Sequence, residues 1–268
     1  MMRPMADELQ LLDGGRCAQI YEFGAGTVLK LYDERFTADW VGQATERAAM
    51  VADAGVSVPR VFGVETIDGR HGAVMERIDG RTLWEEVAQR PADAASLGEE
   101  LARLHAALHT IEVGAEFVDA LELMKDRIAV VADIDDVSRE QALAQIDGAP
   151  DATTLLHGDL HPGNVMVRTS GELVAIDWDF PRRGPATHDA CRAFHLIDSW
   201  ALAPGTNPAV IEVRTAMAEA YLDGYCGSTG AARETITAWT LAHAVARFAE
   251  GIDEERALLA AQIRASRL

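Results

Sequence analysis

Residues 155–180, with the sequence LLHGDLHPGNVMVRTSGELVAIDWDF, decide how this chain is interpreted. Two short apolar runs lie within this stretch, at Val165–Arg168 and Leu173–Ile176. Because Ser170-Gly171 lies between them, the pattern predicts a β-hairpin with a tight turn. In that register Asn164 faces Asp177 at the open end, with the two Cβ atoms about 5 Å apart. An amide oxygen and a carboxylate at this separation can hold one hard divalent cation.

A third oxygen-bearing side chain, Asp159, precedes the hairpin. It is separated from Asn164 by Leu-His-Pro-Gly, and Pro162-Gly163 predicts a turn that returns Asp159 to the same end. Two of the three groups would hold a metal and the third would accept a proton, which is what phosphoryl transfer requires. Taken singly, each residue is better explained as a turn cap, but the joint pattern favours a functional interpretation.

A second candidate site lies near the start of the chain. Only two basic residues are lysines, Lys30 and Lys125. Lys30 falls in a predicted strand, where it must be paired, sit at a cleft or protect a sheet edge. Glu46, on a helix predicted over 36–54, is a candidate partner. Upstream, Gly14-Gly15 predicts either a plain hairpin turn or a turn whose amides approach phosphate.

Composition narrows the classes of function. The chain has 268 residues and a formal net charge of −19, which disfavours a nucleic-acid partner. The acidic middle section is compatible with a cationic substrate, although a solvated helix face explains it better. Three scattered cysteines suggest neither disulfides nor a zinc site. No apolar stretch suggests a membrane span, so we expect a soluble, cytoplasmic protein.

The order of predicted elements indicates an α+β fold. Paired strands are expected up to about residue 78, and helices with one embedded hairpin follow. We therefore predict two lobes, a small β-rich nucleotide-binding lobe over 1–78 and a larger helical lobe over 79–268. The second lobe would carry the hairpin 155–180 and the helices that bind the acceptor.

One stretch also resembles a known family. His157-Gly-Asp159-Leu-His-Pro-Gly-Asn164, followed by Ile176-Asp177-Trp178, closely resembles the aminoglycoside phosphotransferase (choline-kinase-like) branch of the protein-kinase-like superfamily. The resemblance implies a bilobal kinase-like fold. It implies that Asp159 is the catalytic carboxylate and that Asn164 and Asp177 bind Mg²⁺.

The resemblance also assigns nucleotide contacts. Lys30 would contact the α- and β-phosphates and pair with Glu46. Residues 73–80 would form the hinge strand, in which the backbone of Glu76 and Ile78 hydrogen-bonds the base and Met75 lies behind it. Gly14 and Gly15 would line the phosphates, although the loop departs from the glycine pattern of protein kinases.

Supporting roles follow in the same way. Asp189 resembles the family's structural aspartate that braces the catalytic loop, and His157 would hydrogen-bond backbone there. Asp179 either offers a further carboxylate to the metal or faces solvent.

The resulting hypothesis is a Mg²⁺-dependent kinase that moves the γ-phosphate of ATP or GTP to a hydroxyl of a small molecule. An aminoglycoside-like, cationic acceptor is compatible with the sequence, as is a role in antibiotic resistance; a sugar, an amino alcohol or another metabolite is equally consistent. The alternatives are a protein Ser/Thr kinase and a non-catalytic nucleotide-binding module. The short step from Asp177 to Asp189 leaves little room for an activation loop and disfavours the protein kinase.

Overall fold

The computed structural model describes residues 8–15, 17–200, 202 and 205–266. The chain divides into two compact units. The strand-rich unit comprises the described residues of Met1–Gly80 together with Met166–Pro181, and the helical unit comprises those of Arg81–Val165 together with Arg182–Leu268. Contacts therefore group most of the hairpin with the strand-rich unit, whereas the sequence assigned it to the C-terminal lobe. The nucleotide-binding and acceptor-binding labels of the two lobes stay predictions.

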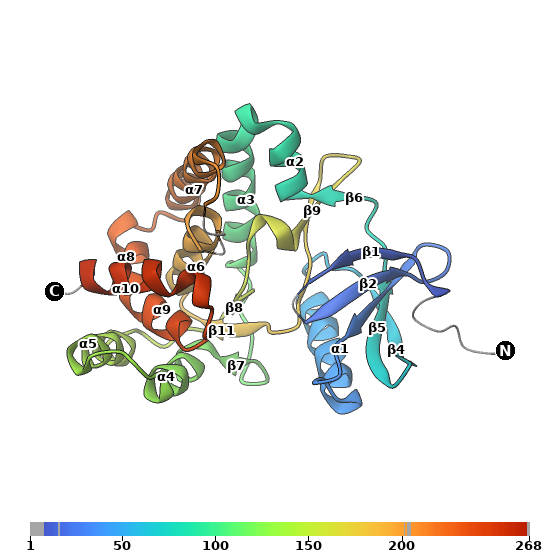
Figure 1. Cartoon of the computed structure of the whole chain (residues 1–268), viewed down its shortest axis with the longest axis horizontal. Helices are drawn as coiled ribbons and strands as arrows, with labels where there is room; N and C mark the ends of the chain where they lie inside the picture. The colour runs from blue at the N-terminus through green and yellow to red at the C-terminus, as the bar shows by residue number, and fades with distance from the viewer. Residues whose placement is uncertain (1–7, 16, 201, 203–204, 267–268) are drawn as a thin grey trace. The chain divides into compact units, whose positions relative to one another are not determined.

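The strand-rich unit is built on an antiparallel sheet of five strands in the order β1-β2-β3-β5-β4 (Figure 1). Its strands are β1 (Leu11–Gly14), β2 (Ala18–Glu22), β3 (Thr27–Tyr32), β4 (Val61–Ile67) and β5 (Arg70–Glu76). The unit also contains α1 (Ala38–Asp53), most of β9 (Val165–Arg168) and β10 (Leu173–Ala175). Helix α1 begins at an N-cap, where the Thr37 hydroxyl accepts from the Trp40 N–H, and it packs on β4 and β5.

The two faces of this sheet carry separate apolar cores, as strand alternation requires. On one face Leu29 and Leu31 of β3 pack with Tyr21 and Ile67. The other face is covered by α1, and there Tyr32 and Ala73 pack with Val41, joined by partly buried apolar side chains at Phe36, Trp40, Val61 and Met75. Lys30 lies on this second side of β3, which is the side the alternation predicts.

The β9–β10 hairpin differs by one residue from the expected register. The Arg168 N–H donates to the Glu172 carbonyl and the Gly171 N–H donates to the Arg168 carbonyl, so the turn holds three residues rather than two. Gly171 has a φ of 88°, a left-handed conformation that glycine adopts at low cost and that adds the extra residue. The argument that set Asn164 directly opposite Asp177 was therefore wrong in its register.

Among its described residues the helical unit contains nine α-helices, three single-turn 3₁₀ helices and a separate sheet of three short strands. The helices are α2 (Leu83–Gln89), α3 (Ala94–Leu108), α4 (Ala120–Val130), α5 (Asp136–Asp147), α6 (Ala186–Asp198), α7 (Pro208–Thr229), α8 (Arg233–Thr237), α9 (Thr240–Phe248) and α10 (Arg256–Ala265). The strands β7 (Val118–Asp119), β8 (Thr154–Leu156) and β11 (Arg182–Gly184) form a small sheet in which β11 is central. The chain passes from the first unit to this one within β6 (Gly80–Thr82).

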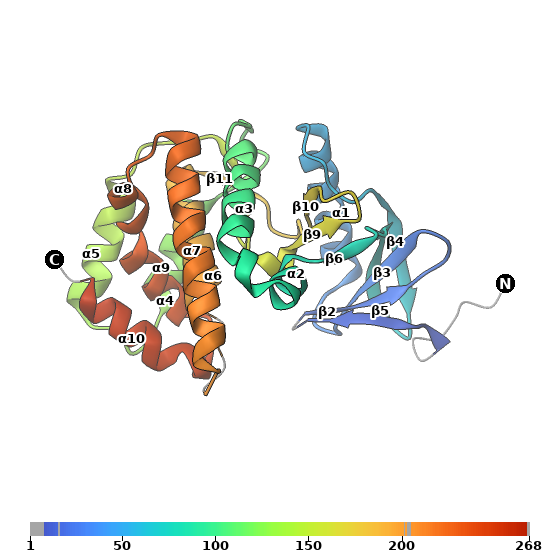
Figure 2. The same cartoon turned by 90° about the horizontal axis from the view of Figure 1, so that it is seen from above.

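Helices α3 and α7 lie side by side over much of their length (Figure 2). Gly98 of α3 permits this approach, because a Cβ at this position would lie 2.3 Å from the Met217 carbonyl oxygen of α7. One turn further along α7, Tyr221 is buried, and Tyr225 follows it. The α3–α7 pair therefore brings polar side chains of two distant segments into one buried region.

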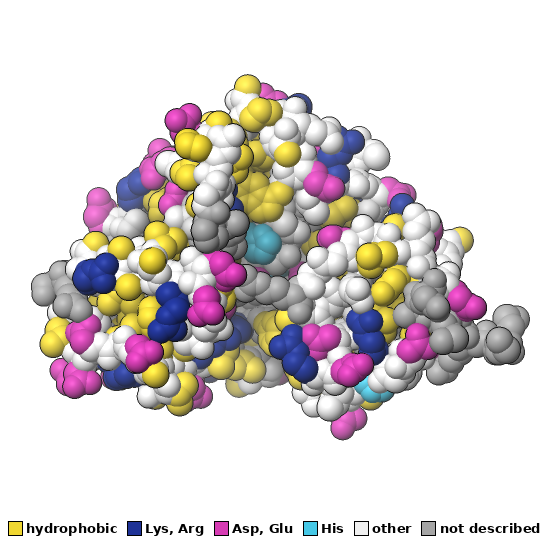
Figure 3. Space-filling view, in the orientation of Figure 1, with side chains coloured by type: hydrophobic (Ala, Val, Ile, Leu, Met, Phe, Trp, Pro, Cys, Tyr) yellow, Lys and Arg dark blue, Asp and Glu magenta, His cyan; other side chains and the backbone are white. Residues whose placement is uncertain are grey.

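The fold class predicted from the sequence is confirmed: a β-rich N-terminal region precedes a helical C-terminal region. On the face seen in Figure 3, acidic and basic side chains are interspersed rather than gathered into one acidic patch. No helix among the described residues combines the length and apolar character that a membrane span needs.

We predict that Gly98→Ala destabilises the helical unit. The added methyl group must push α3 and α7 apart, and such overpacking costs about 1–3 kcal/mol. Gly227→Ala is the matched control, because a Cβ there has open space in the same pair of helices and alanine favours the helix by up to about 1 kcal/mol. Urea unfolding of both variants measures the difference, and equal stabilities would contradict the close-approach argument.

Candidate functional site

A buried carboxylate organises the loop that carries the sequence motif. Asp189, on α6, is 1% exposed. It accepts a hydrogen bond from the His157 N–H at 2.8 Å and another from the Gly158 N–H at 3.1 Å. Gly158 has a φ of 79°, a left-handed conformation that glycine adopts readily. These contacts have the geometry of the brace that the sequence predicted for Asp189.

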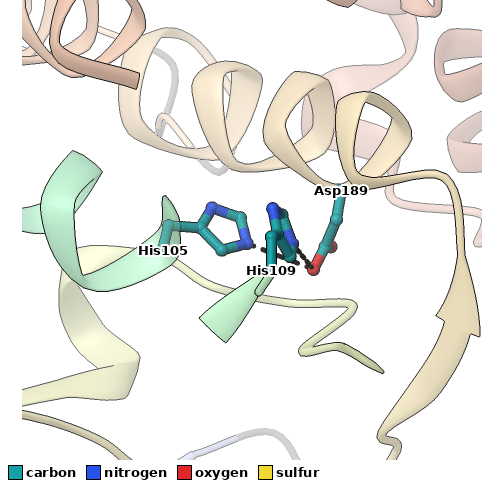
Figure 4. Close-up of side chains that lie close together, drawn as sticks. All are labelled: His105, His109 and Asp189. Atoms are coloured by element: carbon teal, nitrogen blue, oxygen red, sulfur yellow. Dashed lines mark hydrogen bonds and ion pairs between the residues drawn. The ribbon is translucent and has the colours of Figure 1, made fainter. Parts of the chain in front are cut away.

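Two histidines, His105 of α3 and His109 at the C-cap of this helix, complete the surroundings of the carboxylate (Figure 4). The Nε2 atoms of His105 and His109 lie 3.2 and 3.5 Å from Asp189 Oδ2, and their Nδ1 atoms lie 2.7 and 2.6 Å from the hydroxyls of Tyr221 and Tyr225. Burial lowers the pKa of His105 to about 4, so this ring is neutral at pH 7. A neutral ring that donates from Nε2 to the carboxylate must accept at Nδ1 from the tyrosine hydroxyl.

This cluster could also be interpreted as a metal site. The ligand atoms of His105, His109 and Asp189 lie within 4.8 Å of one another. Every ring nitrogen already has a hydrogen-bond partner, however, and the carboxylate also accepts two backbone N–H groups. Although burial alone would raise it, the pKa of Asp189 is held well below its usual range by the hydrogen bonds from His105 and His109. The arrangement is a satisfied hydrogen-bond network.

The loop held by Asp189 carries Asp159 and Asn164. The Asn164 side-chain amide donates to the Asp159 carbonyl at 3.0 Å, which fixes the turn between them. His157 hydrogen-bonds backbone as expected, and His161 does the same: their Nδ1 atoms accept from the N–H groups of Asp159 and Gly163. The Asp159 side chain is 48% exposed and is therefore accessible to a substrate.

Arg192 is a site residue that the sequence analysis missed. Its guanidinium donates to Asp159 Oδ1 at 2.8 Å. Burial alone would raise the pKa of Asp159, but the Arg192 charge outweighs it and lowers this pKa. The signal was present in the spacing, because Asp189 and Arg192 are three residues apart on α6 and share a face.

In the strand-rich unit, Lys30 lies between two carboxylates. Its Nζ is 2.8 Å from Asp177 Oδ1 and 2.7 Å from Asp179 Oδ2, and the Tyr32 hydroxyl donates to the other oxygen of Asp179. Burial opposes the charged form of Lys30, but the charges of Asp177 and Asp179 outweigh burial and raise its pKa. Burial raises the pKa of Asp179, with the Lys30 charge opposing. Asp179 therefore faces Lys30 and not solvent.

Asp177 has an unusual backbone conformation. Its φ is 68°, in the left-handed region that non-glycine residues seldom occupy. The next residue, Trp178, is buried and donates from its indole to the Ala175 carbonyl, which anchors the segment after β10. The anchored tryptophan leaves the Asp177 carboxylate 40% exposed beside Lys30.

The predicted ion pair between Lys30 and Glu46 is not formed in the described part of the chain. Glu46 is exposed on α1, and Lys30 is paired with Asp177 and Asp179 instead. The next residue, Arg47, faces the site, where its guanidinium donates to the Asp179 carbonyl at 2.9 Å. Each residue of a helix is rotated by about 100° from the last, so this one-residue offset turns Glu46 away.

Two residues of the predicted hinge strand, Glu76 and Met75, already make contacts within the strand-rich unit. The Glu76 N–H donates to the Arg60 carbonyl, and Met75 packs on the core beside α1. The N–H of Ile78 has no hydrogen-bond partner among the described residues, so it is available to a ligand. The Gly14-Gly15 segment is exposed and closes the β1–β2 hairpin, with the Gly15 N–H donating to the Ala18 carbonyl. Contacts of these residues with a nucleotide stay predictions.

The structure thus assembles the predicted residues in two groups. Asp159, Asn164, His157 and Asp189 are joined in the helical unit. Lys30 and Asp177 are joined in the strand-rich unit. The convergence of Asp159 and Asn164 with Asp177 stays a prediction. The other lysine, Lys125, belongs to α4, where it pairs with Glu122 and Asp147.

Comparisons with solved structures identify the fold. An aminoglycoside phosphotransferase APH(4)-Ia mutant, in a ternary complex with AMP-PNP and hygromycin B, superposes with a TM-score of 0.67 at 15% identity, covering 97% of this chain and 92% of that one. Aminoglycoside-3′-phosphotransferase of type VIII gives 0.59 at 19% identity, covering 90% and 93%. LicA in complex with AMP gives 0.63 at 15% identity, covering 97% and 92%. The fold is that of the kinase-like aminoglycoside phosphotransferases.

The family model for the phosphotransferase enzyme family matches residues 8–239. The chain therefore belongs to this family, within the protein-kinase-like superfamily, and is a kinase-type phosphotransferase. No curated protein sequence matches the chain.

The neutral state of His105 gives a pH prediction. Its pKa is about 4 in the folded chain against 6.5 unfolded, so its contribution to stability is fully present above pH 6.5 and is lost as the pH falls from 6.5 toward 4. His105→Gln keeps a donor and an acceptor but does not titrate. When the pH is lowered from 6.5 to 4, the unfolding free energy should fall by about 3 kcal/mol less in the variant than in the parent. Parallel pH profiles in urea unfolding would contradict the assignment.

Proposed function

We propose that this chain is a Mg²⁺-dependent kinase that transfers the γ-phosphate of ATP or GTP to a hydroxyl of a small molecule. The observation that carries the proposal is the braced loop of the helical unit. There a half-exposed carboxylate, Asp159, is held by Arg192, next to the Asn164 amide. Kinase-type phosphoryl transfer needs a fixed carboxylate at the acceptor and oxygen ligands for a metal.

The strand-rich unit supplies groups of the right chemistry for the nucleotide. Lys30 is a buried cation that would contact the α- and β-phosphates, and its present partners, Asp177 and Asp179, are carboxylates. Oxygen donors are the ligands that Mg²⁺ prefers, so the donor set fits this metal. Asp177 and Asn164 would hold it, and bound Mg²⁺ would neutralise phosphate charge. The Ile78 N–H would donate to the base and the Glu76 carbonyl would accept from it.

Asp159 would orient the acceptor hydroxyl and receive its proton. The hydroxyl oxygen forms a bond to the γ-phosphorus, the bond from that phosphorus to the β–γ bridging oxygen breaks, and the nucleoside diphosphate leaves with that electron pair. Because its pKa is lowered by Arg192, Asp159 is ionised at neutral pH and can accept the hydroxyl hydrogen bond from the start. Proton transfer then follows as the new bond forms.

Two features favour a small acceptor over a protein. Asp189 follows Asp177 by only 12 residues, which is too short for a protein kinase activation loop. Among the structural relatives, two aminoglycoside phosphotransferase APH(4)-Ia mutants were solved with hygromycin B and AMP-PNP bound. The protein kinase alternative would be supported by phosphate transfer to casein without transfer to any sugar, amino alcohol, hydroxy acid or aminoglycoside.

Replacing the carboxylate at the acceptor tests the catalytic assignment. Asp159→Asn should lower kcat at least ~10²-fold while leaving nucleotide affinity nearly unchanged, because the proton acceptor is lost and the nucleotide contacts are kept. Transfer of labelled γ-phosphate to an acceptor panel measures kcat. Asp126→Asn, on the exposed side of α4, is the control and should behave like the parent. A near-normal rate for Asp159→Asn would remove Asp159 from the mechanism.

Replacing the metal ligand tests the other half of the proposal. Asp177→Asn should weaken Mg²⁺-nucleotide binding about tenfold or more, since an amide is a poorer ligand for a hard cation than a carboxylate. Nucleotide titrations at several Mg²⁺ concentrations measure this change. An unaltered Mg²⁺ dependence would contradict the assignment of Asp177.

A further inference from the structure

The helical unit contains a pocket to which the proposed mechanism assigns no ligand. The pocket is open to solvent on one side, and the space between its lining atoms is about 290 Å³ when the open solvent at its mouth is counted. Its lining combines apolar side chains with three arginines and two histidines: Ala120, Leu123, Met124, Arg127, Arg182, His188, Arg192, His243 and Ala246. No carboxylate belongs to this lining, although the chain as a whole carries a net charge of −19. Such a lining suits an anion.

The positive charges of the pocket are only partly balanced. Arg192 pairs with Asp159 at 2.8 Å and approaches Glu250 at 3.7 Å, and Arg127 shares Glu250 at 3.3 Å. Arg182 makes no ion pair or hydrogen bond through its guanidinium with any described residue. Burial, reinforced by the charges of Arg127 and Arg192, lowers the pKa of Arg182 to about 10. Arg182 is half-buried, and a half-buried arginine beside two others, with no anion of its own, is costly unless a ligand supplies one.

Buried polar atoms in the pocket also lack partners. His188 is 3% exposed, and neither of its ring nitrogens is hydrogen-bonded within the described structure. The Nε of Arg192 is buried without a partner as well. Buried donors in native proteins are nearly always satisfied, so these atoms indicate a missing acceptor. The nearby Asp189 cannot serve, because it already accepts from two backbone N–H groups and two imidazoles.

The position of Arg192 connects the pocket to the chemistry. One side of this residue lines the pocket, and its guanidinium also holds the Asp159 carboxylate. An oxyanion bound in the pocket would therefore lie close to the group that orients the acceptor hydroxyl. Planar guanidinium groups bind carboxylate and phosphate through paired hydrogen bonds. A cluster of arginines is therefore better suited to an oxyanion than a cluster of lysines would be.

We propose that the pocket lined by Arg127, Arg182, Arg192 and His188 binds a carboxylate or phosphate group of the acceptor itself. The inference rests on the proposed function and narrows its substrate class to acidic hydroxyl compounds, such as sugar acids, hydroxy acids or sugar phosphates. It argues against a cationic acceptor, with which the acidic middle section of the chain is compatible. No carboxylate of the acidic middle section lines the pocket, whose lining consists of arginine, histidine and apolar residues.

Binding of inorganic phosphate to the full chain tests the pocket separately from catalysis. Calorimetry should detect phosphate binding to the parent and to Arg103→Gln, which changes an exposed arginine of α3, and about tenfold or weaker binding to Arg182→Gln. Arg182→Lys keeps the charge, so its phosphate affinity should lie between those of the parent and Arg182→Gln. This variant provides the test if Arg182→Gln does not fold. Equal phosphate affinity in the parent and both Arg182 variants, or no binding at all, would overturn the proposal.

Phosphate transfer identifies the source of the anion. Acceptors are offered as matched pairs, a sugar acid with its parent sugar and a hydroxy acid with its amide. The acidic member should be preferred by at least about tenfold in kcat/KM, and Arg182→Lys should raise its KM more than it lowers kcat. Preference for neutral or cationic members would overturn the proposal. So would a loss of nucleotide affinity in Arg182→Lys as large as the loss for phosphate, because the pocket would then serve the nucleotide.

Failure of the proposed function has a different signature. A chain that binds phosphate through Arg182 but neither hydrolyses nucleotide nor phosphorylates any acceptor would refute the kinase and, with it, the acceptor assignment. A chain that phosphorylates neutral acceptors and binds no phosphate would leave the kinase standing and refute the pocket alone.

Discussion

The hydrogen bonds to the Asp189 carboxylate are the constraint on which the helical unit depends. A fully buried carboxylate is stable only when its oxygens accept enough donors, and here two backbone N–H groups and two imidazoles supply them. The donors come from α3 and from the loop after β8, and the tyrosines of α7 complete the histidines' bonding. One ionised group thereby couples the packing of three helices to the backbone of the loop that carries Asp159. Removing its charge would release the loop and the α3–α7 pair together.

The strand-rich unit is organised around the opposite sign of charge. Lys30 is inserted between two carboxylates, one of which also accepts from Tyr32. The negative charges of the two aspartates compensate the burial of the Lys30 ammonium group. Because both aspartates pair with this one group, it fixes the positions of both. Phosphate and a divalent cation would compete for the same groups. In this unit, ligand binding therefore amounts to an exchange of ion partners rather than the filling of a neutral cavity.

Local features of the fold and site could be predicted from the sequence, and contacts between distant segments could not. The strands around Lys30, the turn between Asp159 and Asn164 and the role of Asp189 follow from short motifs, because their hydrogen bonds lie within a few residues or match a family pattern. The partner of Lys30 was assigned to Glu46, but the side of α1 that faces the sheet depends on packing, and Arg47 takes that place. The hairpin register failed for a smaller reason. A glycine in the left-handed conformation lengthens the turn by one residue, and Ser-Gly is compatible with either length.

The scarcity of lysine has a practical consequence. Lys30 is buried and held protonated by two aspartates, whereas Lys125 is the partly exposed one, on α4. At alkaline pH an amine-directed acylating dye should therefore attach to one side chain of the helical unit, with the α-amino group as its competitor. The protein as it stands offers Lys125 as a position for a fluorophore, without an introduced cysteine.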